Sequence, residues 1–218
     1  MNSDLIKFLH EASKKNALPG VIAYNRIDGP GSSLDLREFQ QALWTICDVP
    51  VDVHLDPTAQ WSKNLPRTIG ITIDIVTKVE AHPFKPGLLG VRSIEYCTEV
   101  TAKSGEVPPT KENWLLKFLD ILGLTGVMFV LHNLRPGIQS SGLGGSATAA
   151  TAVCLLANEL ANRPLSPVQL ISMASRIEQD MGVSLTGTQE QSNVIFGGVV
   201  DYVWFPWGIP RHPDSGYG

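Results

Sequence analysis

The chain has 218 residues, of which 43% are hydrophobic, and its formal net charge is −4. This length and hydrophobic content suffice for one folded domain with a substantial core. The slight negative charge provides no broad basic surface for nucleic acid or an anionic membrane, so we expect the partner to be a small molecule.

Cysteine usage and the absence of long apolar runs indicate the compartment. The three cysteines, Cys47, Cys97 and Cys154, are odd in number, widely spaced and set in apolar surroundings. This pattern favours reduced thiols over a disulfide framework. Acidic residues and lysines interrupt the N-terminal residues, and no run of 18 apolar residues occurs anywhere. We therefore predict a cytoplasmic protein.

The first half of the chain alternates amphipathic patterns with turn-forming residues. Apolar residues at helical spacing indicate helices, and strict alternation of apolar and polar residues indicates strands. These signals predict, in chain order, a helix from Ser3 to a stop at Pro19, a strand over 21–24, a turn-rich segment over 25–35, a helix over about 39–47, and strands over 51–55 and from 71 towards 79.

The second half has stronger periodicity. Its patterns predict a strand around 93–100, a turn region over 104–109, a helix from Trp114 to a stop at Gly123, a buried strand over 127–131, a helix over about 146–161, a helix that starts at Ser166-Pro167, and a strand over 199–205. The Pro- and Gly-rich residues 206–218 are predicted to be an unpacked tail.

The most informative segment is the glycine- and serine-rich loop Pro136–Thr148, between the buried strand and a helix. Its glycines allow backbone N–H groups to converge on an anion, and the helix start adds a positive dipole end. The loop contains no lysine, so it is not the GxxxxGK[ST] phosphate loop. A plain connector is one alternative. A dinucleotide fingerprint is another, although a long lead-in over 132–141 and a helix instead of a strand afterwards disfavour it.

The pattern from Pro136 through Ser141-Gly-Leu-Gly-Gly-Ser146-Ala resembles the central signature of the GHMP kinases, Pro-x-x-x-Gly-Leu-Gly-Ser-Ser-Ala. In that superfamily the loop wraps the phosphates of ATP, and the last serine reaches Mg²⁺. The resemblance therefore implies Mg²⁺ binding by Ser146. It implies phosphate binding by Ser140, Ser141, Gly142, Leu143, Gly144, Gly145, Ser146 and Ala147, with Gly145 where the family has a serine.

A second matching segment lies one helix downstream. A glutamate near a helix end is by itself most often a solvated charge, but the family has a Mg²⁺-binding glutamate at the position of Glu178. Sugar-kinase members then carry Gly-Lys-Gln-Asp-Gln and Phe-Gly-Gly, which resemble 187–191 and 196–198 here. The family aspartate, a general base or charge-stabilising partner for the attacking hydroxyl, is Glu190 in this chain, and the lysine is Thr188. The resemblance thus implies that Glu190 is the catalytic residue.

A third segment, Arg26–Leu36, is by composition a turn whose aspartates bond their own backbone. It is also similar to the first motif of the heptose-kinase and fucokinase type, Arg-Ile-Asp-Leu-Ala-Gly-Gly-Thr-Leu-Asp-Leu. In that type the segment lines the sugar pocket, so the resemblance implies substrate binding by Arg26, Asp28 and Asp35. A fixed carboxylate suits sugar hydroxyls, because it accepts hydrogen bonds from them.

Together the three motifs imply an α/β (α+β) fold of the ribosomal protein S5 domain 2-like type, with a mixed sheet and packed helices. They imply an N-terminal GHMP kinase domain over 1–205 that uses ATP and Mg²⁺ to phosphorylate a sugar or sugar phosphate. We expect the family's C-terminal ferredoxin-like domain to be absent. A homodimer or a separate C-terminal partner would be consistent with that. The alternatives are a weak or inactive nucleotide- or sugar-binding module and, less favoured, a nicotinamide-dependent oxidoreductase.

Overall fold

The computed structural model describes residues 2–29, 36, 67–133, 145–161, 164–184 and 186–203. Several predictions lie outside these residues: the helix over 39–47, the strand over 51–55, Asp35, the loop residues Ser140, Ser141, Gly142, Leu143 and Gly144, and the tail over 206–218.

The described chain contains helices and strands in a mixed order. Their order is α1 (Asn2–Lys14), β1 (Gly20–Asp28), β2 (Arg67–Pro83), β3 (Leu88–Ser93), β4 (Thr98–Lys103), the 3₁₀ turn η2 (Lys111–Asn113), α3 (Trp114–Ile121), β5 (Val127–Asn133), α4 (Gly145–Leu160), α5 (Pro167–Asp180), α6 (Gln189–Phe196) and β6 (Val199–Val203).

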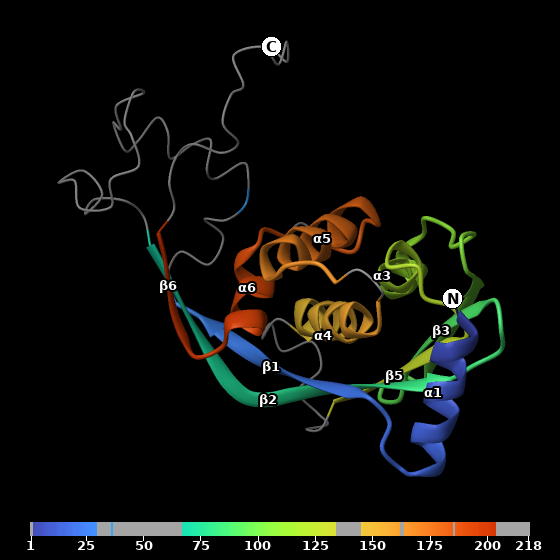
Figure 1. Ribbon diagram of the computed structural model, residues 1–218. Helices are drawn as coiled ribbons and strands as arrows, with labels where there is room; N and C mark the ends of the chain where they lie inside the picture. The colour runs from blue at the N-terminus through green and yellow to red at the C-terminus, as the bar shows by residue number, and fades with distance from the viewer. Residues whose placement is uncertain are drawn as a thin grey trace.

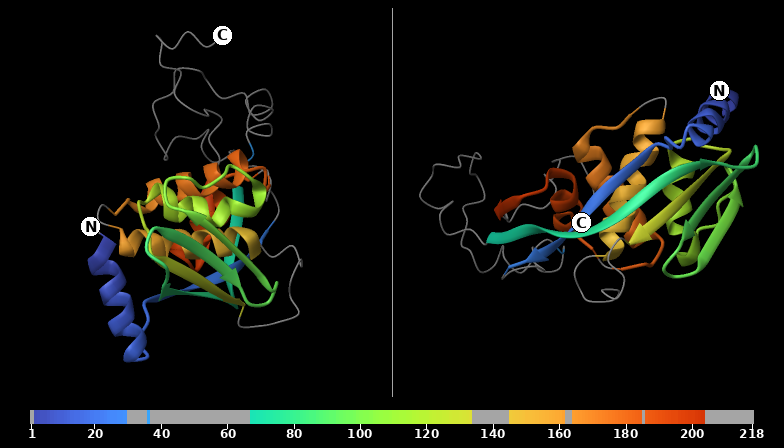
Figure 2. Two further views of the ribbon diagram at one scale, coloured as in Figure 1. Left: turned by 90° about the vertical axis from the view of Figure 1, so that its right-hand side faces the viewer. Right: turned by 90° about the horizontal axis from the view of Figure 1, so that it is seen from below.

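In the described residues, six strands form one mixed sheet in the order β1-β2-β5-β3-β4, with β6 paired to β2. The β3–β5 pair is parallel, and all other pairs are antiparallel. Figures 1 and 2 show α3, α4, α5 and α6 on one face of this sheet, with α4 in its hollow. The predicted mixed α/β fold with packed helices is confirmed.

The long strand β2 bends because its pairing with β1 is irregular. Tyr24 pairs with Val76 and Arg26 with Thr72, so the three residues 73–75 of β2 lie opposite Asn25 alone. Extra residues on one strand kink it and increase its twist. The first part of β2 therefore bends towards the face on which α6 lies, as Figure 1 shows, and pairs with β6 over 67–71.

Helix α4 is the centre of the core because its side chains are small. Nine of its sixteen residues are buried, from Ala147 to Ala157, and it contacts β1 and β2 as well as the helices α3, α5 and α6. Small side chains allow this close approach on several sides at once. Cys154 belongs to this packing, and burial raises the pKa of its thiol to about 12. It is thus a free thiol of the core, in line with the apolar surroundings that the sequence indicates.

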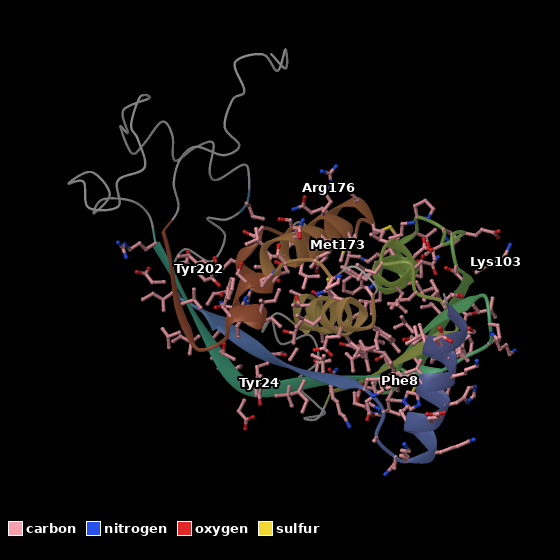
Figure 3. The ribbon with its side chains drawn as sticks, viewed as in Figure 1. Phe8, Tyr24, Lys103, Met173, Arg176 and Tyr202 are labelled. Carbon is pink, nitrogen blue, oxygen red and sulfur yellow. The ribbon has the colours of Figure 1, made fainter. Side chains whose placement is uncertain are left out.

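The opposite face of the sheet is open over β1, β2 and β6. Alternation along these strands places Ile27, Ile71 and Val199 outward, and the register sets them side by side across the three strands. Tyr24 also points away from the helices (Figure 3) and is 45% exposed. At these positions the sheet therefore buries only the face that packs against the helices.

Two predicted elements differ from the structure. The strand predicted around 93–100 is a hairpin instead: β3 ends at Ser93, a turn follows, and β4 starts at Thr98. Cys97 in that turn has a φ of 49°, a left-handed conformation that a continuous strand excludes. The turn-rich segment predicted from residue 25 onwards is also different. It is strand up to Asp28, because the backbone there pairs with β2.

The predicted helices α3, α4 and α5 and the buried strand β5 are confirmed. Helix α5 begins as expected, since Ser166 forms a capping box with Gln169 and Pro167 follows. None of the helices within the described ranges is both long enough and apolar enough to cross a membrane.

Candidate active site

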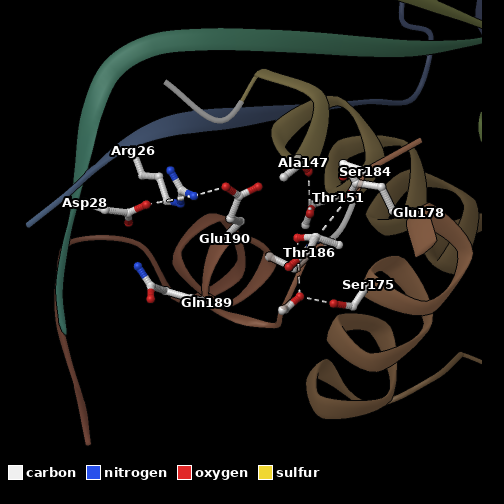
Figure 4. Close-up of polar contacts among 12 residues, drawn as sticks. Arg26, Asp28, Ala147, Thr151, Ser175, Glu178, Ser184, Thr186, Gln189 and Glu190 are labelled. Carbon is white, nitrogen blue, oxygen red and sulfur yellow. Dashed lines mark hydrogen bonds and ion pairs between the residues drawn. The ribbon is translucent and has the colours of Figure 1, made fainter. Parts of the chain in front are cut away.

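The first group of site residues joins the end of β1 to the start of α6. Arg26 and Asp28 are two apart on β1, so they lie on the same face of the strand. The Arg26 guanidinium Nη2 lies 2.8 Å from Asp28 Oδ2 and also donates a hydrogen bond to Glu190 Oε1. Figure 4 shows these three side chains converging. The structure thus brings together three residues that the sequence predicts as substrate-binding or catalytic.

This group carries one positive and two negative charges in a largely buried place. The side chains of Arg26 and Asp28 are 5% and 10% exposed, and that of Glu190 is 31% exposed. Among the described residues, Asp28 Oδ1 and Arg26 Nε are buried without a hydrogen-bond partner. Buried polar atoms without partners are rare in folded proteins and usually meet water or a ligand. The group can therefore accept further hydrogen bonds from a hydroxyl compound.

The second group joins the start of α4 to the end of α5. Glu178, in the last turn of α5, has no exposed surface, whereas Ser146 in the first turn of α4 is exposed. Burial raises the pKa of Glu178, and hydrogen bonds from Ser184, Ser146 and Gln191 act in the opposite direction. Ser146 and Glu178, both predicted to bind Mg²⁺, are therefore neighbours.

Oxygen ligands of this kind fit a hard cation such as Mg²⁺. Within the described residues, no three or more His, Cys, Asp or Glu side chains are grouped so that they could hold a metal ion on their own. Mg²⁺ usually takes one or two protein ligands and completes its shell with phosphate oxygens and water. The pair of Ser146 and Glu178 suits that mode.

Of the predicted phosphate-binding residues, Gly145, Ser146 and Ala147 are described, and all three lie in the first turn of α4. Gly145 and Ser146 are exposed at the helix start, while Ala147 is buried and its carbonyl accepts a hydrogen bond of 2.7 Å from Thr151 Oγ1. An exposed helix start presents free N–H groups and a positive dipole end.

Sequence reasoning missed two side chains that contact Glu178. Ser184 Oγ donates to Glu178 Oε1 over 3.0 Å, and Gln191 Nε2 donates to Glu178 Oε2 over 3.2 Å. Gln191 belongs to the segment that resembles the sugar-kinase motif, so its position in that motif was the available signal. Ser184 has no signal in the sequence.

Helix α6 itself was also missed. Its buried residues are Gln189, Gln191 and Asn193, so amides occupy the positions that apolar side chains take in an ordinary amphipathic helix. Asn193 lies against Gly70 of β2: a Cβ placed on Gly70 would be 1.8 Å from Asn193 Nδ2. The helix that carries Glu190 is thus attached to the sheet through polar side chains.

A comparison with protein families shows which family the residues of this site are similar to. Residues 113–198 match the family model described as the GHMP kinases N terminal domain. Over this range the chain is similar to the GHMP kinases. The matched range includes the start of α4, Glu178 and Glu190. The resemblance that the motifs indicate is confirmed.

One curated protein to which this chain is similar is the homoserine kinase of Corynebacterium efficiens, which is 32% identical over 117 residues. The match covers 51% of this chain and 35% of that enzyme. The chain therefore spans about a third of the relative's length.

Three solved structures show the same fold. The Lactococcus lactis galactokinase complexed with galactose matches with a TM-score of 0.59 and 15% identity, over 88% of this chain and 46% of that one. A D-glycero-D-manno-heptose 1-phosphate kinase from Bacteriodes thetaiotaomicron matches with a TM-score of 0.57 and 18% identity, over 88% of this chain and 60% of that one. The Streptococcus pneumoniae phosphomevalonate kinase in complex with phosphomevalonate and AMPPNP matches with a TM-score of 0.58 and 14% identity, over 86% of this chain and 50% of that one. These similar scores do not single out the heptose-kinase type.

Proposed function

We propose that this GHMP kinase domain belongs to an ATP-dependent kinase that transfers the γ-phosphoryl group to a hydroxyl of a sugar or sugar phosphate. The observation that carries the proposal is the contact of Arg26 with both Asp28 and Glu190. It joins the segment that resembles the sugar-binding motif to the residue at the position of the family's base.

In this proposal Glu190 accepts the proton of the attacking hydroxyl or orients that hydroxyl. Its carboxylate is partly exposed, so one oxygen can face the substrate while Arg26 holds the other. General base catalysis of this kind typically contributes about 10²- to 10⁴-fold in rate. Arg26 fixes the position of the base, because a guanidinium donates along defined directions.

Asp28 serves as a hydrogen-bond acceptor for substrate hydroxyls. Its Oδ2 contacts Arg26, whereas its Oδ1 has no partner in the part of the chain that the structure describes. A buried acceptor without a partner disfavours an analogue that lacks the matching hydroxyl, since the acceptor then stays unsatisfied. This supports a polyhydroxy substrate.

The nucleotide side is formed by the start of α4 and by Glu178. We propose that residues 140–147 bind the phosphates of ATP and that Ser146 and Glu178 hold Mg²⁺. When bound, the cation neutralises charge on the transferred phosphoryl group. The AMPPNP complex of the phosphomevalonate kinase supports a nucleotide in this fold.

A second candidate function is a binding module with weak or no turnover. The observation that favours it is the ion pair of Glu190 with Arg26, because the guanidinium then occupies one of the two carboxylate oxygens that could contact a substrate hydroxyl. Glutamate also stands where the family has aspartate, and errors of about 1 Å in a catalytic group can lower the rate about 100-fold.

The two functions separate in one experiment. Binding of Mg·ATP is measured by calorimetry, and ATP consumption is measured with a panel of hexoses and heptose phosphates. The kinase predicts binding and sugar-dependent consumption. Binding without consumption, unchanged by Glu190→Asp, would favour the binding module, and no binding at all would overturn both.

A further inference from the structure

Glu178 is a buried carboxylate held by uncharged donors. It has no exposed surface, and within the described residues it forms no ion pair with a lysine, arginine or histidine. A buried carboxylate without a cationic partner is unfavourable unless hydrogen bonds or a bound cation compensate it. What orients this carboxylate therefore matters for any cation that it binds.

Gln191 reaches Glu178 from the neighbouring helix. Its Nε2 donates to Glu178 Oε2 over 3.2 Å and also lies 3.4 Å from Thr186 Oγ1. Gln191 is fully buried, and its Oε1 has no hydrogen-bond partner within the described ranges. Ser184 donates to the other carboxylate oxygen, Oε1, over 3.0 Å. Both oxygens of Glu178 thus accept hydrogen bonds from protein groups, in addition to the hydrogen bond from Ser146.

We propose that Gln191 is a positioning residue that, together with Ser184, orients the Glu178 carboxylate for a divalent cation bound with the nucleotide. The inference rests on the proposed function, because it requires the cation site at Ser146 and Glu178. Groups that hydrogen-bond to a metal ligand fix its orientation, and their loss typically lowers metal affinity about 10- to 100-fold.

Gln191 also links the two halves of the site. It follows Glu190 directly on α6, and successive residues of a helix point about 100° apart. Glu190 contacts Arg26 on β1, whereas Gln191 contacts Glu178 on α5. One turn of α6 therefore sets the position of the proposed base and of the proposed cation ligand.

The test compares nucleotide affinity with and without metal. The affinity for AMPPNP is measured by calorimetry in EDTA and again in Mn²⁺, and the ratio of the two is the metal-dependent gain. Gln191→Met removes the amide donor at similar length. We expect it to lower the gain about tenfold or more, while affinity in EDTA changes less than about twofold.

Ser192→Ala, on the same helix, is the matched control and should keep the full gain. Ser184→Ala removes the other donor from an exposed residue, so it decides the matter if Gln191→Met does not fold. A wild-type gain that both variants retain overturns this inference alone. Equal losses with and without metal also overturn it, because they indicate a purely structural role. A wild-type chain without any gain overturns the proposed cation site and this inference together.

Discussion

Arg26 and Glu190 lie 164 positions apart in the sequence, yet the guanidinium of one donates a hydrogen bond to the carboxylate of the other. Asp28 takes part in the same contact. The bend of β2 beside α6 makes this approach possible, because it turns the end of the β1–β2 pair towards the helix. The proposed acceptor side of the site is therefore a product of strand geometry.

The Glu190 carboxylate is expected to be essential for turnover. Glu190→Gln should lower kcat for sugar phosphorylation about 10²- to 10⁴-fold, since an amide cannot accept the proton. Nucleotide affinity should stay within about twofold, because the residue contacts β1 and not the start of α4. Steady-state kinetics and calorimetry measure both. Glu159→Gln, which neutralises an exposed glutamate on α4, is the control. Wild-type kcat in Glu190→Gln would contradict the role.

Glu178 is expected to lower stability above the pH at which it ionises. Burial raises its pKa in the folded state above the ordinary value of 4.5, so the fold loses stability as pH rises from that value through the raised one. Glu178→Gln lacks this loss. The unfolding free energy of Glu178→Gln relative to that of the wild type should therefore be lowest near pH 4 and should increase towards pH 7.

Urea denaturation from pH 4 to pH 8 measures the difference in unfolding free energy. The same variant should lose the metal-dependent gain in AMPPNP affinity, about tenfold or more. A stability difference that does not change with pH would show that ionisation of Glu178 plays no part. Glu159→Gln again serves as the control, because it removes a carboxylate that is exposed.

Gly70 is expected to be required because Asn193 occupies the space over it. A Cβ on Gly70 would lie 1.8 Å from Asn193 Nδ2, and β2 is paired on both sides there, with Asp28 and Val200. Gly70→Ala should destabilise the fold by about 1–3 kcal/mol. In an Asn193→Ala background the same change should be far milder, because the clash is gone.

A double-mutant cycle measured by chemical denaturation gives this coupling. Gly145→Ala is a suitable control for stability, since a Cβ there meets no atom within 4 Å. Equal destabilisation by Gly70→Ala in the wild-type and Asn193→Ala backgrounds would contradict the contact between Asn193 of α6 and Gly70 of β2.

The capping box of α5 is expected to contribute measurably to stability. Ser166 accepts a hydrogen bond from the Gln169 backbone N–H, and the Gln169 side chain accepts one from the Ser166 N–H. Ser166→Ala should cost about 1 kcal/mol, or roughly 2–4 °C in Tm for a chain of this size. Ser172→Ala, at an exposed mid-helix position, should leave Tm unchanged or raise it. Equal Tm values for the two variants would contradict the cap.

The sequence by itself determined the elements whose burial is apolar. Helix α4, with Ala150 and Val153 on its buried stripe, and strand β5, an unbroken apolar run, were predictable because hydrophobic periodicity records which side chains leave water. The family was also readable from the sequence, since a phosphate-binding loop needs glycines at set positions. The hairpin turn between β3 and β4 was not predictable, because Ile94 and Tyr96 have strand-forming side chains but are exposed in the turn.

Only the tertiary structure decided how the site is connected. Helix α6 has no apolar periodicity, since amides such as Gln191 and Asn193 are buried on it, and its position follows from contacts with Glu178 and Gly70. The sequence indicated that Arg26, Glu178 and Glu190 matter, but not which of them touch. Hydrogen bonds between side chains far apart in the chain depend on the bend of a strand and the facing of two helices, and local sequence patterns do not encode either.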